Sequence, residues 1–356
     1  MATPINGVRI SGIKYKLRRK FKEEPNSSIN IGSIVLQNDQ TINIQIPQFT
    51  SSVNYNVNLM PHLSIRGLNI PSHRTPYSYR KISSIPVRAH TNKEAFETFN
   101  NTLRQRFSGQ YHGETPGYHM KASIISLAVF GSGNDFVQAD EKAFDLFNGF
   151  IDILKKLLPP TLGFKTLGIV DGEVILQTAS GDFLLDSVSG GIGAIFDLAW
   201  QIYMFSSGEE SPFFILIDEA ENHLHASMQR QLLPNLLSSF PNAQFIVTTH
   251  SPLMVNSVKD SSVYVLKYNK NNAVESHLLD FDNKAAGAAE ILREVLGVPV
   301  TMPIWVEKSL ENIIIKYQSQ GLNVESYQSL KSDLAELGLA DHLPQALGML
   351  QGGEPS

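Results

Sequence analysis

The spacing of apolar residues predicts strands in the first seventy residues of the chain. Apolar and polar positions alternate there, as they do on a strand with one buried face, and Asn38-Asp39 supplies a turn signal. The alternating stretches are residues 8–17, 32–36, 41–46 and 53–59. We therefore expect an antiparallel sheet at the start of the chain, followed by a short strand near residues 68–70.

Helical signals begin near residue 90. Thr91 and Glu94 have the spacing of a capping box, which predicts a helix that runs to about Phe107. Residues 108–120 contain glycine and histidine and predict a loop, and residues 124–130 form an apolar run.

A second helix and a pair of strands are predicted in the next forty residues. Apolar positions recur at helical spacing over residues 137–158, until Pro159-Pro160 stops the helix. Strands are expected at residues 166–170 and 173–178, on either side of Asp171-Gly172.

The last seventy residues predict three helices. The predicted helices cover residues 284–296, about 305–318, and 326–337. Gly297, Gly321 and Gly338 follow their ends, in positions where glycine commonly stops a helix. Trp305 is expected to anchor the core of this region.

Two continuous apolar runs, Phe213–Ile217 and residues 245–247, predict the central part of the fold. An amphipathic helix over about Ala226–Ser239 separates them, which favours parallel strands covered on both faces. Polar residues follow both strands, Asp218-Glu219 after the first and Thr248-Thr249-His250-Ser251 after the second. Ligands of open α/β sheets lie beyond the carboxyl ends of the strands, so Asp218, Glu219 and His250 should converge on one site.

Composition narrows the class of protein. The chain has no cysteine, which excludes disulfides, thiolate zinc sites and a cysteine nucleophile and suits the reducing cytoplasm. Hydrophobic residues make up 42% of the chain, which argues against intrinsic disorder. No apolar run approaches the roughly 20 residues of a membrane helix, and the basic first twenty residues lack the apolar segment of a secretory signal.

Charge is distributed unevenly along the chain. Residues 1–130 hold 16 of the 29 basic residues and 6 of the 34 acidic ones. Residues 131–356 therefore hold 13 basic and 28 acidic residues. A basic first part suggests a polyanion or an acidic partner, and DNA is one such partner. The alternative is ordinary surface charge, because the basic residues are spread out instead of forming one stripe.

A strand that ends in Asp-Glu is typical of nucleotide hydrolases. The aspartate holds Mg²⁺, and the adjacent glutamate polarises the water that attacks the terminal phosphate. His250 is placed to hydrogen-bond that phosphate. The structural alternative is a capping aspartate and a buried histidine with its hydrogen bonds satisfied.

Ser189-Gly190-Gly191 precedes a run of apolar residues at helical spacing. A Ser-Gly-Gly turn at a helix start presents backbone N–H groups and the positive end of the helix dipole to an anion. By itself the motif is also an ordinary helix start.

Farther along the chain, potential metal ligands alternate with other residues, at Glu219, Glu221, His223 and His225. No zinc-binding spacing such as HExxH is present, so Mg²⁺ delivered with ATP is favoured over a structural metal.

Taken in order, the Ser-Gly-Gly segment, ILIDEAENHLH and TTHSP resemble the heads of ABC-type ATPases. The chain is most similar to the branch that contains SMC, RecF and OLD-like proteins, many of them linked to DNA repair or phage defence. The resemblance implies that Asp218 is the Walker B aspartate and Mg²⁺ ligand, Glu219 the catalytic base and His250 the switch histidine. It also implies that residues 189–191 cap ATP bound by a partner subunit. Ser72-His73-Arg74 would contact nucleotide or partner.

One element of that family is absent from this sequence. The phosphate loop GxxGxGK[ST] does not occur: residues 131–135 lack the Lys-Ser/Thr pair that ends the motif, and residues 113–117 with Lys121 have the wrong spacing. In the family this loop precedes the antiparallel sheet. We therefore expect a missing N-terminal segment, with a degenerate ATPase as the competing interpretation.

The sequence thus predicts an α/β protein, a P-loop NTPase-like ABC-ATPase head with a mixed sheet. Its expected parts are an antiparallel subdomain at 1–70, a helical lid at 71–162, an ATPase core at 163–280 and a helical tail at 281–356. The expected function is ATP hydrolysis coupled to a homodimer or higher oligomer, acting on DNA or on an effector such as a nuclease encoded nearby, in the cytoplasm and without a membrane. The alternative is a scaffold or sensor subunit that does not hydrolyse ATP.

Overall fold

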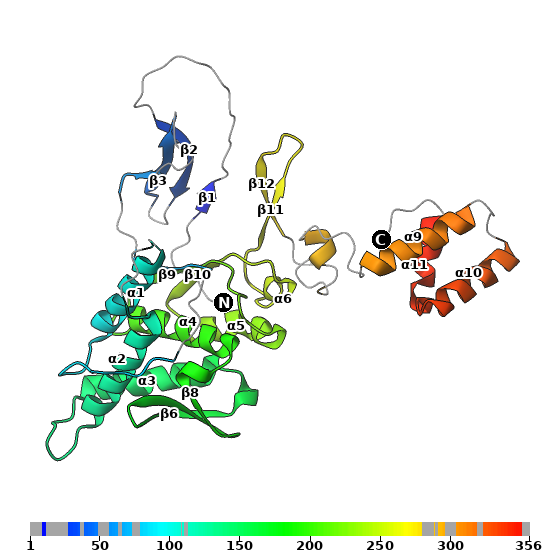
Figure 1. Cartoon of the computed structure of the whole chain (residues 1–356). Helices are drawn as coiled ribbons and strands as arrows, with labels where there is room; N and C mark the ends of the chain where they lie inside the picture. The colour runs from blue at the N-terminus through cyan, green and yellow to red at the C-terminus, as the bar shows by residue number, and fades with distance from the viewer. Residues whose placement is uncertain are drawn as a thin grey trace. The chain divides into compact units, whose positions relative to one another are not determined.

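The computed structural model describes residues 9–11, 28–35, 39–48, 57–62, 66–72, 79–107, 109, 113–279, 288, 291–295, 304–318 and 323–350. The chain divides into two compact units (Figure 1). The first contains residues 1–260 and 267–276, and the second contains residues 261–266 and 277–356. Because the chain folds into both helices and sheets, the predicted α/β class is confirmed.

The predicted antiparallel sheet at the start of the chain is present. It consists of β1 (Arg9–Ser11), β2 (Ser28–Val35), β3 (Thr41–Pro47) and β4 (Asn58–Met60), in that order and with antiparallel neighbours. Ile42 and Ile46 of β3 are buried, which confirms the predicted apolar face, but Ile44 on the same face is half-buried like Asn43 and Gln45. The face is therefore only partly covered.

The parallel sheet of the first unit contains β5 (Gly67–Ile70), β9 (Phe213–Ile217) and β10 (Ala243–Val247) in the order β10-β9-β5. The short strand after the antiparallel sheet therefore joins this second sheet, through the pairing of Ile70 with Ile217. On the other side of β9, Val247 pairs with Ile217. Since all three strands run in the same direction, their carboxyl ends lie at one edge.

The prediction that these strands are covered on both faces was wrong. Phe213, Ile215 and Ile217 of β9 are buried, but Leu216 between them is 42% exposed, and Ile246 of β10 is 40% exposed. Apolar side chains therefore continue onto a face of the sheet that is only partly covered, so a continuous apolar run did not require burial on both sides.

Four helices pack in sequence against one another: α1 (Asn92–Phe107), α2 (Pro116–Ser132), α3 (Glu141–Leu157) and α4 (Gly190–Ser206) (Figure 1). Their shared core contains Trp200, Phe196 and Phe150, whose rings meet edge to face. The predicted helices at 91–107 and 137–158 correspond to α1 and α3.

The loop predicted for residues 108–120 was wrong from Pro116 onward, because α2 begins there. Thr115 caps the helix by accepting a hydrogen bond from the Tyr118 amide, and Pro116 occupies the first turn, where its missing N–H costs nothing. The helix is buried on nearly every side, including Met120, Ile124 and Leu127. A helix without a solvent face shows no periodic spacing of apolar residues, so the sequence pattern contained no helical signal.

The pair of strands around Asp171-Gly172 is confirmed. β6 (Phe164–Val170) and β7 (Glu173–Thr178) are antiparallel, and β8 (Asp182–Leu184) adds a third strand. Asp171 and Gly172 have φ of 52° and 79°, the two positive angles that a two-residue hairpin turn of this kind requires. The 3-10 turns at Pro160–Leu162 and Leu185–Ser187 flank this sheet.

The remaining elements of the central region are α5 (Ala226–Ser239), the short α6 (Pro252–Val255) and the strands β11 (Tyr264–Tyr268) and β12 (Val274–Leu278). Helix α5 has the predicted bounds. Strands β11 and β12, which pair with each other, were not predicted.

The second unit has its own apolar core. It contains α9 (Ile304–Gln318), α10 (Val324–Glu336) and α11 (Leu343–Leu350), with a 3-10 turn at Ala340–His342. The two predicted helices at 305–318 and 326–337 are confirmed, and Gly338 follows α10 with φ of 71°. Of the predicted helix at 284–296 the structure describes residue 288 and a π-helical turn at Ile291–Val295, and Gly297 and Gly321 lie outside the described residues.

Trp305 does not anchor this core. It is 60% exposed, and the neighbouring Val306 fills the buried position instead. None of the described helices has the length and hydropathy needed to cross a bilayer.

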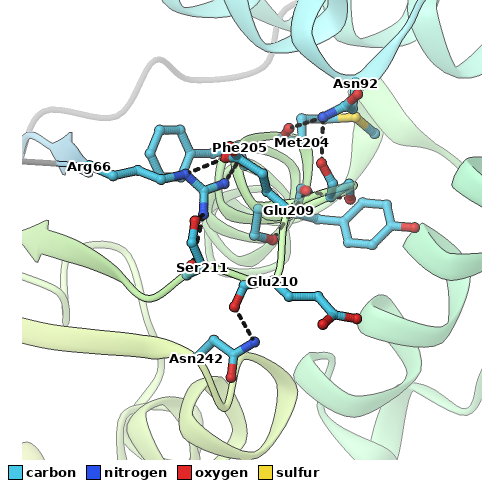
Figure 2. A network of polar contacts seen from close by, with 11 residues as sticks. Arg66, Asn92, Met204, Phe205, Glu209, Glu210, Ser211 and Asn242 are labelled. Atoms are coloured by element: carbon cyan, nitrogen blue, oxygen red, sulfur yellow. Dashed lines mark hydrogen bonds and ion pairs between the residues drawn. The ribbon is translucent and has the colours of Figure 1, made fainter. Parts of the chain in front are cut away.

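Arg66, at the amino end of the parallel sheet, fixes the connection from α4 into β9 (Figure 2). Its guanidinium donates to the Phe205 and Ser211 carbonyls, at 3.0 and 2.9 Å, and pairs with Glu209 at 2.7 Å. Asn92 of α1 donates in the same region to the Ser207 carbonyl at 2.7 Å. These contacts satisfy carbonyls at the end of α4 and lie at the edge of the sheet opposite the carboxyl ends.

The predicted capping box makes the start of α1 sensitive to pH. The Thr91 amide donates to the Glu94 carboxylate at 2.9 Å, and the Glu94 amide donates to the Thr91 hydroxyl at 3.3 Å. Hydrogen bonds from Arg88 and then from Thr91 lower the pKa of Glu94 to about 2. Because this folded-state pKa lies below that of the unfolded chain, the carboxylate stabilises the fold above about pH 4.

We expect this stabilisation to disappear as the pH falls from about 4 toward 2. Thermal unfolding of the wild type and of Glu94→Gln should differ at pH 6, differ less at pH 3, and converge as the pH approaches 2. Glu97→Gln is the control, since the Glu97 carboxylate lies 4.0 Å from its nearest cation, Lys93, and both side chains are exposed. A difference that persists unchanged down to pH 2 would contradict the prediction.

Candidate active site

The carboxyl ends of β9 and β10 bring the predicted residues to one edge of the parallel sheet. The Thr248 amide donates to the Ile217 carbonyl at 3.0 Å, and the Ala220 amide donates to the Thr248 carbonyl at 3.3 Å. The Asp218 amide donates to the Ile70 carbonyl at 3.0 Å. Asp218 and Glu219 therefore lie between the ends of β5 and β10.

Thr248 connects the two acidic residues directly. Its hydroxyl donates to an Asp218 carboxylate oxygen at 2.5 Å and accepts from the Glu219 amide at 2.9 Å. The hydroxyl thereby fixes one oxygen of Asp218 and leaves the other available to a ligand. Thr248 had no individual role in the sequence-based prediction, because this contact depends on the register between the two strands.

Glu219 has an unusual backbone conformation. Its φ is +43°, in the left-handed region that residues with a β-carbon rarely occupy. The Asn222 amide side chain donates to the Glu219 carboxylate at 2.8 Å and to the Ser72 carbonyl at 3.2 Å. Strained backbone that neighbouring contacts hold in place is often found at functional sites. Asn222 thus orients the carboxylate from the end of β5.

The loop that contains His250 is attached to the segment after β9. Glu221 accepts hydrogen bonds from the Thr249 hydroxyl at 2.7 Å and from the His250 amide at 2.5 Å. Gln229 of α5 accepts from the Ser251 hydroxyl at 2.6 Å. Glu221 therefore positions the His250 backbone, a role that the sequence did not indicate.

The Ser-Gly-Gly segment forms the start of α4. The Ser189 hydroxyl caps the helix by accepting from the Ile192 amide at 3.5 Å. A β-carbon added to Gly191 would lie 3.0 Å from the His223 carbonyl, so glycine permits a close approach to the turn that follows Glu219. Ser189 and Gly190 are exposed. The segment is thus a capped helix start next to the acidic residues.

The two glycine-containing segments at residues 113–121 and 131–135 do not form a phosphate loop. Lys121 has a side-chain exposure of 1% and pairs with Asp186 and Glu173, so it cannot reach a ligand at the sheet edge. A β-carbon on Gly133 would lie 2.6 Å from the Ala139 amide nitrogen, which shows that backbone fills the space around this turn. His73 and Arg74 lie outside the described residues.

The donor set fits magnesium better than a structural metal. No three His, Cys, Asp or Glu residues within the described ranges are arranged to hold a metal ion. The His225 ring accepts a hydrogen bond from the Ser227 amide at 3.3 Å and caps α5, instead of joining a cluster with Glu221. Protein-bound Mg²⁺ commonly takes one or two carboxylates and completes its shell with water and phosphate oxygens. The exposed Asp218 carboxylate fits this pattern.

The Thr248 hydroxyl should contribute to the stability of the fold, because it makes two hydrogen bonds at the sheet edge. We expect Thr248→Val to lower stability by about 1–3 kcal/mol, because the Glu219 amide loses its acceptor and Asp218 loses its donor. Urea denaturation would measure the change, with Thr248→Ser as the control that keeps the hydroxyl. Equal stability of the valine and serine variants would show that the hydroxyl contributes nothing.

Comparison with known proteins gives the family and its relatives. Residues 10–255 match the AAA ATPase domain family. The chain is 32% identical over 97 residues to the Retron Ec83 probable ATPase of Escherichia coli, a match that covers 26% of this chain and 17% of that protein. It is 27% identical over 169 residues to the Septu protein PtuA of Bacillus thuringiensis, covering 44% of this chain and 43% of that protein. The matches thus span less than half of either relative's length.

Among solved structures, the SMC head domain from Thermotoga maritima is 15% identical. The alignment covers 72% of this chain and 76% of that chain, with a TM-score of 0.34.

Proposed function

We propose that this chain, which belongs to the AAA ATPase domain family, binds ATP with Mg²⁺ and hydrolyses it at the edge of the parallel sheet. The observation that carries the proposal is the Thr248 hydroxyl, which joins Asp218 and the Glu219 backbone at the ends of two adjacent parallel strands. A rigid acidic pair at this edge is suited to a metal-bound nucleotide.

Each acidic residue has a separate task in this proposal. Asp218 holds Mg²⁺, directly or through water, and the bound ion neutralises charge on the phosphates. Glu219 accepts a hydrogen bond from Asn222 at 2.8 Å, which aims its carboxylate for the attacking water. Glu219 then accepts the proton of that water as it attacks. Glu221 holds the loop from which His250 contacts the terminal phosphate.

The Ser189, Gly190 and Gly191 segment completes the site in a second copy of the chain. The segment starts a helix of 17 residues, whose first N–H groups and positive dipole end favour an anion. Its exposed position suits contact with ATP held by a partner subunit. Two heads would then enclose nucleotide between them, and hydrolysis would open the dimer.

The downstream partner follows from the family resemblance and from the relatives. Dimer opening and closing would act on DNA or on an effector protein, such as a nuclease encoded nearby, in the cytoplasm. The retron and Septu relatives support a role of this kind in phage defence, and DNA repair follows from the family resemblance alone. The basic residues of the first part of the chain would contact DNA or an acidic partner.

A scaffold that does not bind nucleotide is the second candidate. The observation that favours it is the lack of a phosphate loop in the sequence, together with the buried Lys121 and the filled turn at Gly133. Such a subunit would keep the shape of an ATPase and recruit its effector without hydrolysis.

Calorimetric titration with ATP and Mg²⁺ separates the two candidates. The titration uses this chain and, beside it, the same chain extended through any open frame upstream. Binding by either form, abolished by Asp218→Ala, supports the ATPase. Binding that survives Asp218→Ala contradicts the assigned metal ligand, and absence of binding in both forms supports the scaffold.

A further inference from the structure

A buried ionic cluster joins the antiparallel sheet β6-β7-β8 to the segment that precedes α4. Lys121 of α2 donates to an Asp186 carboxylate oxygen at 2.5 Å, to the Arg80 carbonyl at 2.7 Å and to a Glu173 carboxylate oxygen at 3.2 Å. The side-chain exposures of Lys121, Asp186 and Glu173 are 1%, 4% and 12%. The three donors of the ammonium group thus have three acceptors.

The cluster joins parts of the chain that are distant in sequence. Lys121 comes from α2, Glu173 from β7 and Asp186 from the 3-10 turn Leu185–Ser187. The Arg80 amide also donates to Asp186 at 3.4 Å, and the Tyr79 hydroxyl donates to Glu173 at 3.2 Å. Nothing in the catalytic proposal uses these residues.

Asp186 lies three residues before Ser189. The Leu185 side chain beside it is fully buried, and Val188 packs against the apolar core. The chain therefore reaches Ser189 from a point that is fixed by both charge and packing. Val188 and Ser189 have extended backbones, with ψ of 155° and 154°. The chain between Asp186 and the start of α4 is therefore nearly straight, so a shift of Asp186 would move the helix start with it.

We propose that Lys121 and Asp186 are positioning residues for the Ser189–Gly191 helix start. The ion pair fixes the position of the chain before α4 and therefore the direction of the first N–H groups of the helix. The close approach of Gly191 to the His223 carbonyl depends on the same position of the helix start. This inference rests on the proposed function, in which that helix start contacts the nucleotide.

Two single variants separate positioning from general stability. Wild type holds one buried cation and two carboxylates. Asp186→Ala and Glu173→Ala each leave Lys121 with one carboxylate, so the charge balance of the two variants is the same. Asp186→Ala cuts the connection to the helix start, whereas Glu173→Ala preserves it.

The first measurement is hydrogen exchange of the backbone amides at residues 187–195, which requires no ATP. Exchange should be faster in Asp186→Ala than in Glu173→Ala, while the two variants unfold at similar urea concentrations. Equal exchange in the two variants would overturn the proposal, as would faster exchange spread evenly over α2 and β7.

The second measurement is steady-state ATP hydrolysis by the form of the protein that binds ATP. We expect kcat of Asp186→Ala to fall about tenfold to a hundredfold, as misplacement of a catalytic element does, with KM nearly unchanged. Glu173→Ala should retain turnover near wild type. A change in KM alone, or an equal loss of kcat in both variants, contradicts the proposal. If wild type hydrolyses no ATP but exchange differs as expected, the proposed function fails and the positioning role stands.

Discussion

Glu219→Gln is expected to slow ATP hydrolysis by about 10²–10⁴-fold, the usual contribution of a general base. Glutamine keeps the size of the side chain and can still accept the hydrogen bond from Asn222, so the loop should keep its shape. What it loses is the carboxylate that, in the proposed mechanism, would accept a proton from the attacking water. Binding of ATP with Mg²⁺ should persist, because Asp218 is unchanged.

The variant should therefore accumulate a closed, ATP-bound dimer. Single-turnover hydrolysis would give the rate, and size-exclusion chromatography with light scattering would give the mass with and without ATP. Glu210→Gln is the matched control, since Glu210 is exposed and lies beyond the amino end of β9. Unchanged turnover in Glu219→Gln would remove Glu219 from the catalytic role.

The largest stability effect is expected at Lys121. Lys121→Met leaves the carboxylates of Asp186 and Glu173 together in a buried site without a cation, which should cost about 3–5 kcal/mol. The Arg80 carbonyl loses its hydrogen bond in the same variant. Methionine fills much of the volume of the lysine chain, so the cost comes from charge and not from a cavity.

Urea denaturation at pH 7 would measure this change. Lys142→Met is the control, because Lys142 is exposed on α3 and a surface substitution of this kind usually changes stability by less than about 0.5 kcal/mol. Partial recovery in Lys121→Met combined with Asp186→Asn would confirm that the unpaired charge is the cause. Equal unfolding midpoints for Lys121→Met and Lys142→Met would show that the cluster stabilises nothing.

Elements that face both core and solvent were predictable from sequence. The alternation in β3 and the helical spacing in α3 arise because one side of each element is buried and the other is wet. Local chemistry was equally informative at Asp171-Gly172 and at the capping box of α1, since these contacts span a few residues.

Elements without that asymmetry were missed or misjudged. Helix α2 is buried nearly all round and was partly predicted as loop, and its Lys121 showed no sign of being internal. Trp305 was expected in a core because tryptophan is large and apolar, yet a valine beside it took that position. Burial of a single residue depends on what packs against it, which composition does not state.

In the candidate site, too, some residues were predictable from the sequence and others were not. The order of apolar and polar residues was enough to place Asp218, Glu219 and His250 after two strands, because a short apolar run that ends in polar residues is typical of a strand and the turn that follows it. How these three residues are held could be learned only from the folded chain. Thr248, Asn222 and Glu221 act through hydrogen bonds between segments that meet across the sheet edge. Register and loop geometry fix such contacts, and these arise from packing of the whole sheet and not from any local pattern.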